Sequence, residues 1–555
     1  MTPDALSRLG LTQAWARPVH VPAGAQSIRD QQLFVHEKAP HEYVIITAPK
    51  PTPPADAATA TTPDAATPDA TAPATPAEPE TIVLARIPID RIGINGAPIG
   101  RAEAERLASN EIRRLKRRGV DAEMQVITSP RINLYTIGSD GLLECRNAET
   151  GEPIWIQRVG RPSLPYSNLG VDERYITVVN GGNLIQVDAE NGEILREVRA
   201  EGAPAFGAVN TSGFAVVPLI GGGIESYSLH VPRPNEPEHV PVRMRVRGTT
   251  LAMPAKAPNS SSIAWGTSAG FVYVASLSGP RGPELRFRHP REMHRKPNKT
   301  FMGQASITGI TSGRIAAASG DRFFYGTDQG QVCALRARGT GEVLWAVPLG
   351  EPFYKRPLVF EDQVLINSSY GNLFSLSVEN GLQTWNGSVP NIGELLGVLD
   401  QRLYATTMSG GLVVLDVKTG KKLAAFNDIR PEYFIVNDLT DRLYLVSNDG
   451  DVQCIRPEGA NLPTLVSHTE PKKTVKTATP ETDPTQAPAQ PVGNDPFGAG
   501  QKDPFGAGGG NNDPFGGGGG GNADPFGGGG NADPFGGGGA GGDGGMADPF
   551  GGSPF

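Results

Sequence analysis

The chain has 555 residues and a formal net charge of −8, with 71 glycines and 50 prolines. This length suits two or three average domains or one large repeat architecture. The mildly acidic balance argues against general nucleic-acid binding. No run of about 18 apolar residues occurs that could span a bilayer.

The first 48 residues contain apolar stretches that predict strands contributing to the closure of a larger β-structure. The segment "LTQAWARPVHV" (11–21) contains Trp15 and is a candidate for a closing strand, whereas "QQLFVHEKAPHEYVIIT" (31–47) predicts two strands around a turn. The start of the chain lacks the unbroken apolar core of a signal peptide. The sequence alone therefore predicts a cytoplasmic location.

Two stretches are biased in composition. Residues 49–80 are rich in Pro, Ala and Thr, and residues 461–555 form a Gly-rich tail. Neither can bury enough apolar surface to offset the conformational entropy lost on ordering. We therefore predict a disordered linker and a disordered tail.

Between the linker and the repeats, residues 81–129 predict a strand (81–89) and a basic helix (101–119). One face of that helix carries Ala104, Leu107, Ala108, Ile112 and Leu115. Arginines and lysines crowd the rest of the helix and its C-terminal end, where cations suit the helix dipole. We expect the helix to pack on the rim of the domain that follows. The alternative is docking on an anionic surface.

From residue 130 to about 460 the chain repeats one phrase. "DGLLECRNAETGEPIW" (140–155) returns as "QGQVCALRARGTGEVLW" (329–345). Each unit predicts a strand, a glycine turn, an alternating strand, a second turn and a third strand. Spacings near 40 residues are typical of four-stranded propeller blades. The glycines expected at the first turn, with positive φ, are Gly141, Gly182, Gly223, Gly270, Gly330, Gly371, Gly410 and Gly450.

Three units end in a tryptophan, at Trp155, Trp345 and Trp385. A large ring can fill the gap between two twisted sheets, so we expect these residues to pack between adjacent blades. The three cysteines lie at similar places within their units and are expected to be small buried hydrophobes: Cys145, Cys333 and Cys454.

The repeated phrase resembles the pyrroloquinoline-quinone-like (PQQ-like) β-propeller repeat, over roughly residues 130–457. That family contains quinoprotein alcohol dehydrogenases and the non-enzymatic outer-membrane-assembly propeller BamB. The fold predicted is an all-β propeller of four-stranded antiparallel blades. The number of units and the resemblance indicate eight blades, with seven as the alternative. The resemblance also implies an alternative location in the periplasm or cell envelope.

The sequence offers no recognisable catalytic site. Quinoprotein dehydrogenases are expected to have an adjacent Cys-Cys disulfide, calcium ligands and a catalytic Asp, whereas this chain has no Cys-Cys pair. Turn chemistry explains the aspartates of the repeats. His289 and His294 lie on a presumed solvated loop, not on the helix that a zincin pair needs. We predict no enzymatic activity, no cofactor and no metal site.

Two candidate partner-binding regions remain. The basic stretch 286–299 is expected to be an exposed loop, and the tail repeats Asp-Pro-Phe on flexible Gly-rich spacers. Several weak contacts on one tail would raise avidity; a solubilising tail is the alternative. The candidate residues are Arg288, Arg291, Arg295 and Lys296 in the basic stretch, and Phe497, Phe505, Phe515, Phe526, Phe535, Phe550 and Phe555 in the tail.

The function predicted is a monomeric, non-enzymatic scaffold for protein partners, in its most specific form a BamB-like factor in bacterial envelope assembly. A degenerate quinoprotein or another small-ligand propeller is the alternative.

Overall fold

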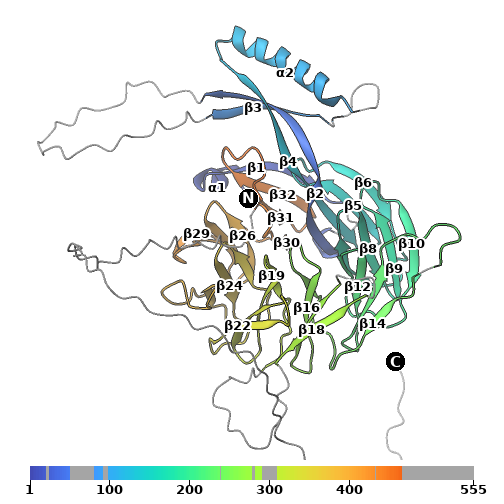
Figure 1. The fold of residues 1–555 in the computed structure, drawn as a ribbon. Coiled ribbons are helices and arrows are strands. Elements are labelled where there is room, and N and C mark those ends of the chain that lie inside the picture. The colour runs from blue at the N-terminus through green and yellow to red at the C-terminus, as the bar shows by residue number, and fades with distance from the viewer. Residues whose placement is uncertain are drawn as a thin grey trace, which may run out of the picture. The chain divides into compact units, whose positions relative to one another are not determined.

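The computed structural model describes residues 1–20, 24–49, 81–89, 91, 98–237, 239–277, 282–290, 309–431 and 433–465. These residues belong to one compact unit, Met1–Thr474. They form eight antiparallel sheets, as predicted for an eight-bladed propeller. Contacts between the innermost strands run in order from the first sheet to the seventh, and the seventh sheet contacts the eighth. Strand β2 (Ile28–Pro49) of the first sheet contacts β30 (Tyr433–Ile435) of the eighth and so closes the ring (Figure 1).

The first four sheets follow chain order. Their strands are β2 (Ile28–Pro49), β4 (Glu123–Gly138), β5 (Leu142–Asn147) and β6 (Pro153–Arg158); β7 (Tyr166–Val171), β8 (Tyr175–Asn180), β9 (Asn183–Asp188) and β10 (Ile194–Arg199); β11 (Val209–Thr211), β12 (Phe214–Pro218), β13 (Ile224–Ser228) and β14 (Val242–Met244); and β15 (Ala255–Lys256), β16 (Ser262–Gly266), β17 (Val272–Ser276) and β18 (Glu284–His289).

The next three sheets continue the ring. Their strands are β19 (Ala316–Ala318), β20 (Arg322–Gly326), β21 (Gln331–Arg336) and β22 (Glu342–Pro348); β23 (Leu358–Phe360), β24 (Gln363–Asn367) and β25 (Leu373–Ser377); and β26 (Leu395–Leu399), β27 (Arg402–Thr406), β28 (Leu412–Asp416) and β29 (Lys422–Phe426).

The eighth sheet combines both ends of the described chain. Its inner strands are β30 (Tyr433–Ile435), β31 (Leu443–Val446) and β32 (Asp451–Pro457), and its outer strand is β1 (Leu11–Pro18). Leu11 pairs with Pro457 and Pro18 with Asp451. The short helix α1 (Pro3–Arg8) precedes β1, and the 3₁₀ turn η1 (Gly24–Ser27) follows it. The segment that contains Trp15 is thus the strand that completes the last sheet.

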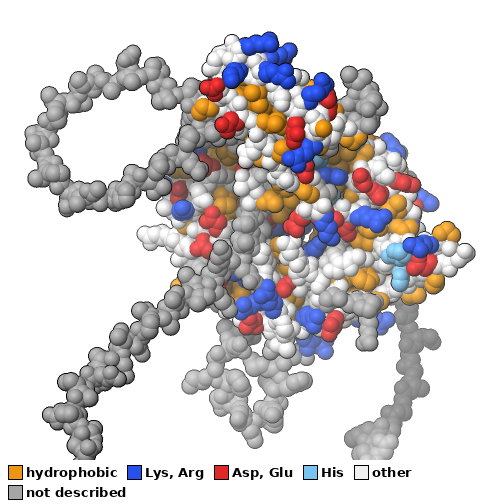
Figure 2. Space-filling view, turned by 45° about the horizontal axis from the view of Figure 1, so that its top comes forward, with side chains coloured by type: hydrophobic (Ala, Val, Ile, Leu, Met, Phe, Trp, Pro, Cys, Tyr) orange, Lys and Arg blue, Asp and Glu red, His pale blue; other side chains and the backbone are white. Residues whose placement is uncertain are grey.

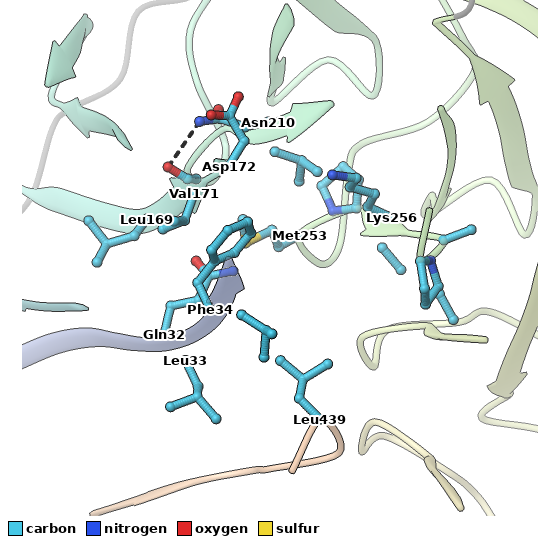
Figure 3. A pocket seen from close by; sticks show the side chains of 18 of the residues that line it. Gln32, Leu33, Phe34, Leu169, Val171, Asp172, Asn210, Met253, Lys256 and Leu439 are labelled. Carbon is cyan, nitrogen blue, oxygen red and sulfur yellow. Dashed lines mark hydrogen bonds between the residues drawn. The ribbon is translucent and has the colours of Figure 1, made fainter. Parts of the chain in front are cut away.

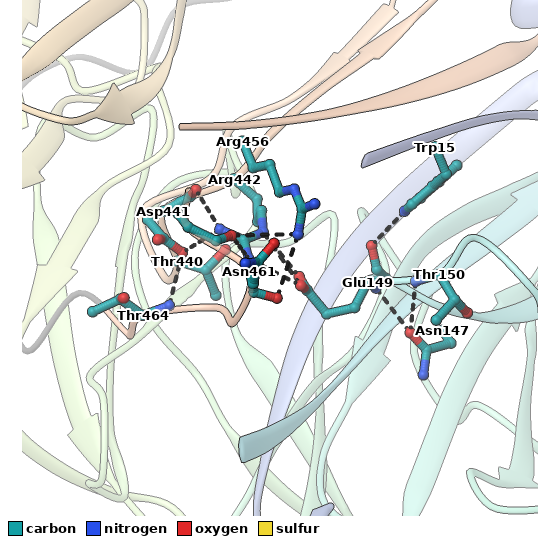
Figure 4. Close-up of polar contacts among 12 residues, drawn as sticks. Trp15, Asn147, Glu149, Thr150, Thr440, Asp441, Arg442, Arg456, Asn461 and Thr464 are labelled. Atoms are coloured by element: carbon teal, nitrogen blue, oxygen red, sulfur yellow. Dashed lines mark hydrogen bonds and ion pairs between the residues drawn. The ribbon is translucent and has the colours of Figure 1, made fainter. Parts of the chain in front are cut away.

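A buried ion pair lies at the seam between the first and last sheets. Arg442, which precedes β31, has no exposed side-chain surface, and its Nη2 lies 3.1 Å from Glu149 Oε2 in the first sheet. Its Nη1 lies 2.9 Å from Asp441 Oδ1. The Trp15 indole N–H donates to the carbonyl oxygen of Ala148 at 2.9 Å (Figure 4). A buried cation is tolerated only with partners of this kind.

An arm extends from the first sheet. The inner part of β2 pairs with β4 up to His36↔Arg131, and after a register shift the pairing resumes from His41↔Ser129 to Thr47↔Glu123. The added strand β3 (Thr81–Pro88) pairs with this outer part of β2. Helix α2 (Gly100–Arg117) lies across the three-stranded outer sheet (Figure 1).

The arm corrects three expectations. Residues 31–47 are part of one long strand and not two strands around a turn, because β4 pairs with them on both sides of the register shift between His36 and His41. Strand β4 crosses the boundary predicted at residue 129. Helix α2 packs not on the propeller rim but on the outer sheet, where Ala104 and Ala108 are buried against Val44 and Ile46. No described helix is long and apolar enough to cross a membrane.

Candidate functional site: the central channel and the rim

The innermost strands line a central channel with a cavity of about 1230 Å³. Its wall is largely apolar and includes Leu33, Phe34, Val171, Met253 and Leu439 (Figure 3). These side chains come from strands and loops of four different sheets. A cavity of this size and lining is large enough for a small molecule or a peptide side chain.

Two carboxylates of the channel wall have structural partners. Asp30 accepts hydrogen bonds from the Leu169 N–H at 2.8 Å and from Asn168 Nδ2 at 3.1 Å. Asp172 accepts from the N–H groups of Arg174 at 2.9 Å and Tyr175 at 2.7 Å. Burial raises the pKa of both carboxyls. Their oxygens hold loops and neighbouring strands in place, which explains them without catalysis.

Two cations of the channel wall, Lys256 and Arg356, interact with carboxylates. Burial lowers the pKa of the Lys256 amine, although Asp172 and Glu173 act on it in the opposite direction. The Arg356 guanidinium reaches Asp438 Oδ2 at 2.5 Å. Charged groups therefore interrupt the apolar wall of the channel.

The quinone cofactor and calcium of the PQQ-dependent enzymes do not fit the residues present. The three cysteines lie on β5, β21 and β32 and are buried and free, so no vicinal disulfide can form. Burial raises the pKa of the Cys145 and Cys333 thiols to about 12, which makes them unreactive at neutral pH. The described residues contain no group of three or more His, Cys, Asp and Glu side chains placed to hold a metal ion.

The first-turn glycines follow the predicted register in six units. Left-handed φ values of +78° to +88° occur at Gly141, Gly270, Gly330, Gly371, Gly410 and Gly450. In the other two units the left-handed residue is one position earlier, at Gly181 (φ +61°) and Gly222 (φ +86°), so Gly182 and Gly223 do not have the predicted role. Consecutive glycines hide the register, because either one can adopt positive φ.

The three predicted tryptophans lie between neighbouring sheets. The indole N–H groups of Trp155, Trp345 and Trp385 donate to carbonyl oxygens of the next sheet, at 3.1 Å to Ala189, 3.0 Å to Val378 and 3.0 Å to Val417. Their rings lie against a second-turn glycine of that sheet. A Cβ would approach the ring to 2.6 Å at Gly192, 2.7 Å at Gly381 and 2.8 Å at Gly420.

Sequence reasoning missed part of this arrangement. Trp15 makes the same contact with Gly151, and Phe287 replaces the tryptophan against Gly341. From the sequence, turn chemistry alone accounts for the second-turn glycines. Each is the glycine of a "TG" or "NG" pair, and this regular place in the repeat is the signal that the sequence contains. Only the neighbouring sheet shows that a ring occupies the space a side chain would need.

The basic stretch is only partly described, and the prediction of an exposed loop is wrong where it can be checked. Arg288 lies on strand β18, with its guanidinium 5.1 Å from the centre of the Phe271 ring. His289, also expected on a solvated loop, is buried on β18 with its Nδ1 2.8 Å from the Tyr325 hydroxyl. Arg291, Arg295, Lys296 and His294 lie outside the described residues, as do all the tail phenylalanines named above.

Three large side chains are exposed on loops of neighbouring sheets, on the rim that carries the first turns. We call Tyr354, Tyr370 and Met408, which are 49%, 68% and 54% exposed, the rim patch. The turn of Tyr370 touches Met408, since a Cβ on Gly371 would lie 2.8 Å from Met408 Cγ.

The loop of Tyr354 is tied to the same turn. The N–H of Ser369 donates to the carbonyl oxygen of Pro352 at 2.8 Å. Polar pairs border the patch: Lys355 Nζ lies 2.8 Å from Glu394 Oε1, and Asn372 Nδ2 donates to Glu351 Oε1 at 2.8 Å. Hydrogen-bonded loops therefore present these large side chains with polar pairs beside them.

The eight sheets and the ring of innermost strands define a β-propeller protein. A family model described as "Outer membrane protein assembly factor BamB" matches residues 285–474. The outer membrane protein assembly factor BamB of Shewanella oneidensis is 25% identical over 170 residues, 27% of this chain and 40% of that protein. Within the propeller class, residues 285–474 are similar to the PQQ-like family that the repeats resemble. The chain matches 40% of the length of the Shewanella oneidensis protein, which is less than half.

Several solved structures are similar to the chain. BamB from Moraxella catarrhalis is 15% identical with a TM-score of 0.43, covering 58% of this chain and 91% of that chain. Chaetomium thermophilum Sqt1 bound to the N-terminus of ribosomal protein L10 is 12% identical with a TM-score of 0.42, covering 58% and 93%. The dihydro-heme d1 dehydrogenase NirN is 13% identical with a TM-score of 0.39, covering 59% and 66%.

Proposed function

We propose that this chain is a non-enzymatic scaffold that binds protein partners through the rim patch. The observation that carries the proposal is the exposure of Tyr354, Tyr370 and Met408 on loops of neighbouring sheets that contact one another. Protein interfaces are enriched in aromatic residues and methionine at their centre and are polar at their margin. A few such residues commonly supply most of the binding free energy.

The finer proposal is a BamB-like role in the assembly of envelope proteins. The family match over residues 285–474 includes the whole rim patch, which supports this role. It requires a location in the periplasm or envelope and not the cytoplasm predicted from the sequence. Separation of soluble, periplasmic and membrane fractions of the source cells, followed by immunodetection, distinguishes the two locations.

The basic stretch and the tail remain additional parts of the proposal. Arg288, Arg291, Arg295 and Lys296 would add charge to a protein contact, and the seven tail phenylalanines would add weak multivalent contacts. A chain ending after Val492 tests the tail separately from the propeller. If the truncated chain loses its partners while the rim variants keep them, the tail and not the rim is the binding element.

The rim patch is tested by affinity purification of the full-length chain and quantitative mass spectrometry. We expect Tyr370→Ala/Met408→Ala to reduce recovery of specific partners by about tenfold or more, since central interface residues commonly contribute about 2 kcal/mol or more. Leu382→Ala/Leu423→Ala is the matched control, because these side chains are also exposed, at 67% and 48%, but lie outside the patch. Equal recovery with all three proteins would contradict the rim proposal.

Small-ligand binding in the channel is a second candidate function. It is favoured by the cavity of about 1230 Å³ and by Gln32 on its wall, whose Oε1 is buried and has no hydrogen-bond partner among the described residues. The test is a change in absorption or thermal stability with a quinone and calcium, and separately with other small ligands. A response that Gln32→Leu abolishes would favour this function over the scaffold.

A further inference from the structure

Helix α2 concentrates positive charge in a chain that is acidic as a whole. From Gly100 to Arg118 it has seven basic residues and three acidic ones, a net charge of +4, against −8 for the full chain. Each glutamate lies beside an arginine of the same helix: Glu103 by Arg106, Glu105 by Arg101 and Glu111 by Arg114.

Four further cations of the helix have no acidic partner among the described residues. Arg113, Lys116, Arg117 and Arg118 are all exposed and occupy the C-terminal half of the helix and its cap. Asp121 and Glu123, which follow, are also exposed and reduce this local charge without reversing it. The Arg and Lys side chains gather over α2 at the top of Figure 2.

The opposite face of α2 is already occupied. Ala104 and Ala108 are buried against Val44 and Ile46, and Ile112 and Leu115 pack on the same cluster. The helix therefore cannot insert an apolar face into a lipid layer. Whatever binds α2 must bind its charged outer face, at the end of the arm away from the propeller (Figure 1).

We propose that the outer face of α2 docks on the surface of an anionic lipid bilayer. The helix of 18 residues lies broadside on a sheet and presents its cations at the tip of a protruding arm, which suits an extended charged plane. Clusters of lysine and arginine are attracted to anionic lipid surfaces within about a Debye length. The acidic remainder of the chain is repelled by the same surface, so the arm would orient the propeller above it.

The exposed face of α2 is less suited to binding nucleic acid than to binding a lipid surface. Residues 100–118 contain no aromatic side chain that could stack on a base. Asn110 is the one amide side chain in that range, whereas base recognition in a groove uses several polar contacts from one helix. A lipid surface requires only charge and access.

The experiment is co-flotation of the full-length chain with vesicles. Phosphatidylcholine vesicles containing about one-third phosphatidylglycerol are compared with pure phosphatidylcholine, at low salt and at about 0.5 M NaCl, where the Debye length is only several Å. We expect binding to the anionic vesicles alone, lost at high salt. Each cation near such a surface contributes roughly a fivefold factor in affinity, so Arg113→Gln/Lys116→Gln/Arg117→Gln/Arg118→Gln should weaken binding by at least about tenfold.

The matched control removes four cations elsewhere. Lys418, Lys421, Lys422 and Arg430 are exposed in and after the sheet of β26–β29, and their quadruple glutamine variant should bind vesicles like the unmodified chain. Circular dichroism checks that both variants are folded. Absent binding, equal binding to neutral vesicles, or equal losses in the two variants would overturn the proposal. Tighter binding to duplex DNA or to an acidic peptide than to the anionic vesicles would also overturn it.

Discussion

The ring of Trp345 lies against Gly381 of the neighbouring sheet, and its N–H donates to the carbonyl oxygen of Val378 at 3.0 Å. The side chain is only 8% exposed. One residue thus combines burial of a large apolar surface with a polar contact between two sheets. Because the same contact recurs in several units, it is a property of the repeat and not of one blade.

We predict that Trp345→Ala lowers the free energy of unfolding by about 3–5 kcal/mol, the range for deleting a large buried aromatic side chain. Trp345→Phe keeps most of the ring and loses the N–H donor, so its cost should be smaller, about 1–2 kcal/mol. Denaturant unfolding of the three proteins measures both. A loss below about 1 kcal/mol for Trp345→Ala would contradict the packing role.

His36 makes a pH-dependent contribution to the free energy of unfolding. Its Nε2 lies 3.1 Å from the Tyr135 hydroxyl and 3.2 Å from Asn133 Nδ2, and its Nδ1 lies 3.3 Å from Glu173 Oε2. Burial, with the charge of Arg131, lowers its pKa to about 4. The folded protein therefore holds a neutral imidazole between that value and the pKa near 6.5 of an unfolded chain.

As the pH falls, His36 takes up a proton in the unfolded chain at a higher pH than in the folded chain. Its contribution to the free energy of unfolding is therefore fully present above pH 6.5 and is lost as the pH falls towards 4. We expect the unmodified chain to lose about 2 kcal/mol more than His36→Gln between pH 7 and pH 4.5, from about 1.4 kcal/mol per pKa unit. The difference between the two unfolding curves isolates this group from other titrations. Parallel pH dependence of both proteins would show that His36 does not titrate in this way.

At the scale of elements, the arm is an addition to the first sheet and not a ninth blade. Its core of Val44, Ile46, Ala104 and Ala108 is separate from the clusters that join the blades. The inner part of β2 keeps its own pairing with β4, ending at His36↔Arg131. The propeller and the arm therefore have largely independent packing, although they share two strands.

We predict that the arm can be removed without unfolding the propeller. Replacing residues 37–130 with Asn-Gly joins the paired residues His36 and Arg131 by a two-residue hairpin turn. The thermal unfolding midpoint should change by only a few degrees, corresponding to about 1 kcal/mol, while binding to anionic vesicles should disappear. Loss of cooperative unfolding would show instead that the arm is required for the first sheet to form.

At the scale of the whole molecule, ring closure depends on contacts between the two ends of the described chain. Strand β1 completes the sheet of β30–β32, and Arg442 joins that sheet to Glu149 of the first. These partners are 293 residues apart in the sequence. Bringing these segments together therefore costs more conformational entropy than forming a contact between neighbours in the sequence.

We predict that Glu149→Gln lowers the free energy of unfolding by about 3 kcal/mol, because it leaves the fully buried Arg442 with an incomplete set of partners. Glu379→Gln is the control, since its ion pair with Arg322 at 3.0 Å leaves the Glu379 side chain 62% exposed, and it should cost less than about 1 kcal/mol. Calorimetry of both variants measures the difference. If both variants lower the free energy of unfolding by the same small amount, the ion pair at the seam is not important for the stability of the ring.

The sequence by itself determined the repeat, the class of fold and most turn positions. Glycine turns, strand alternation and the terminal tryptophans act within about 20 residues, where backbone propensity and side-chain periodicity decide the outcome. These local rules predicted the repeated strands and turns, whereas the eight blades of the all-β propeller were predicted from the number of units and the resemblance to the PQQ-like repeat. Where two glycines are adjacent, as at Gly181 and Gly182, the same rules could not choose the register.

Only the tertiary structure decided how distant segments meet. The long strand β2, the arm beneath α2, the Arg442–Glu149 pair and the rim patch each depend on residues far apart in the chain. Whether an apolar residue is exposed, as Tyr370 is, or buried, as Trp345 is, depends on which sheet lies beside it. Local sequence sets the units, and packing between units sets the surfaces through which the molecule can act.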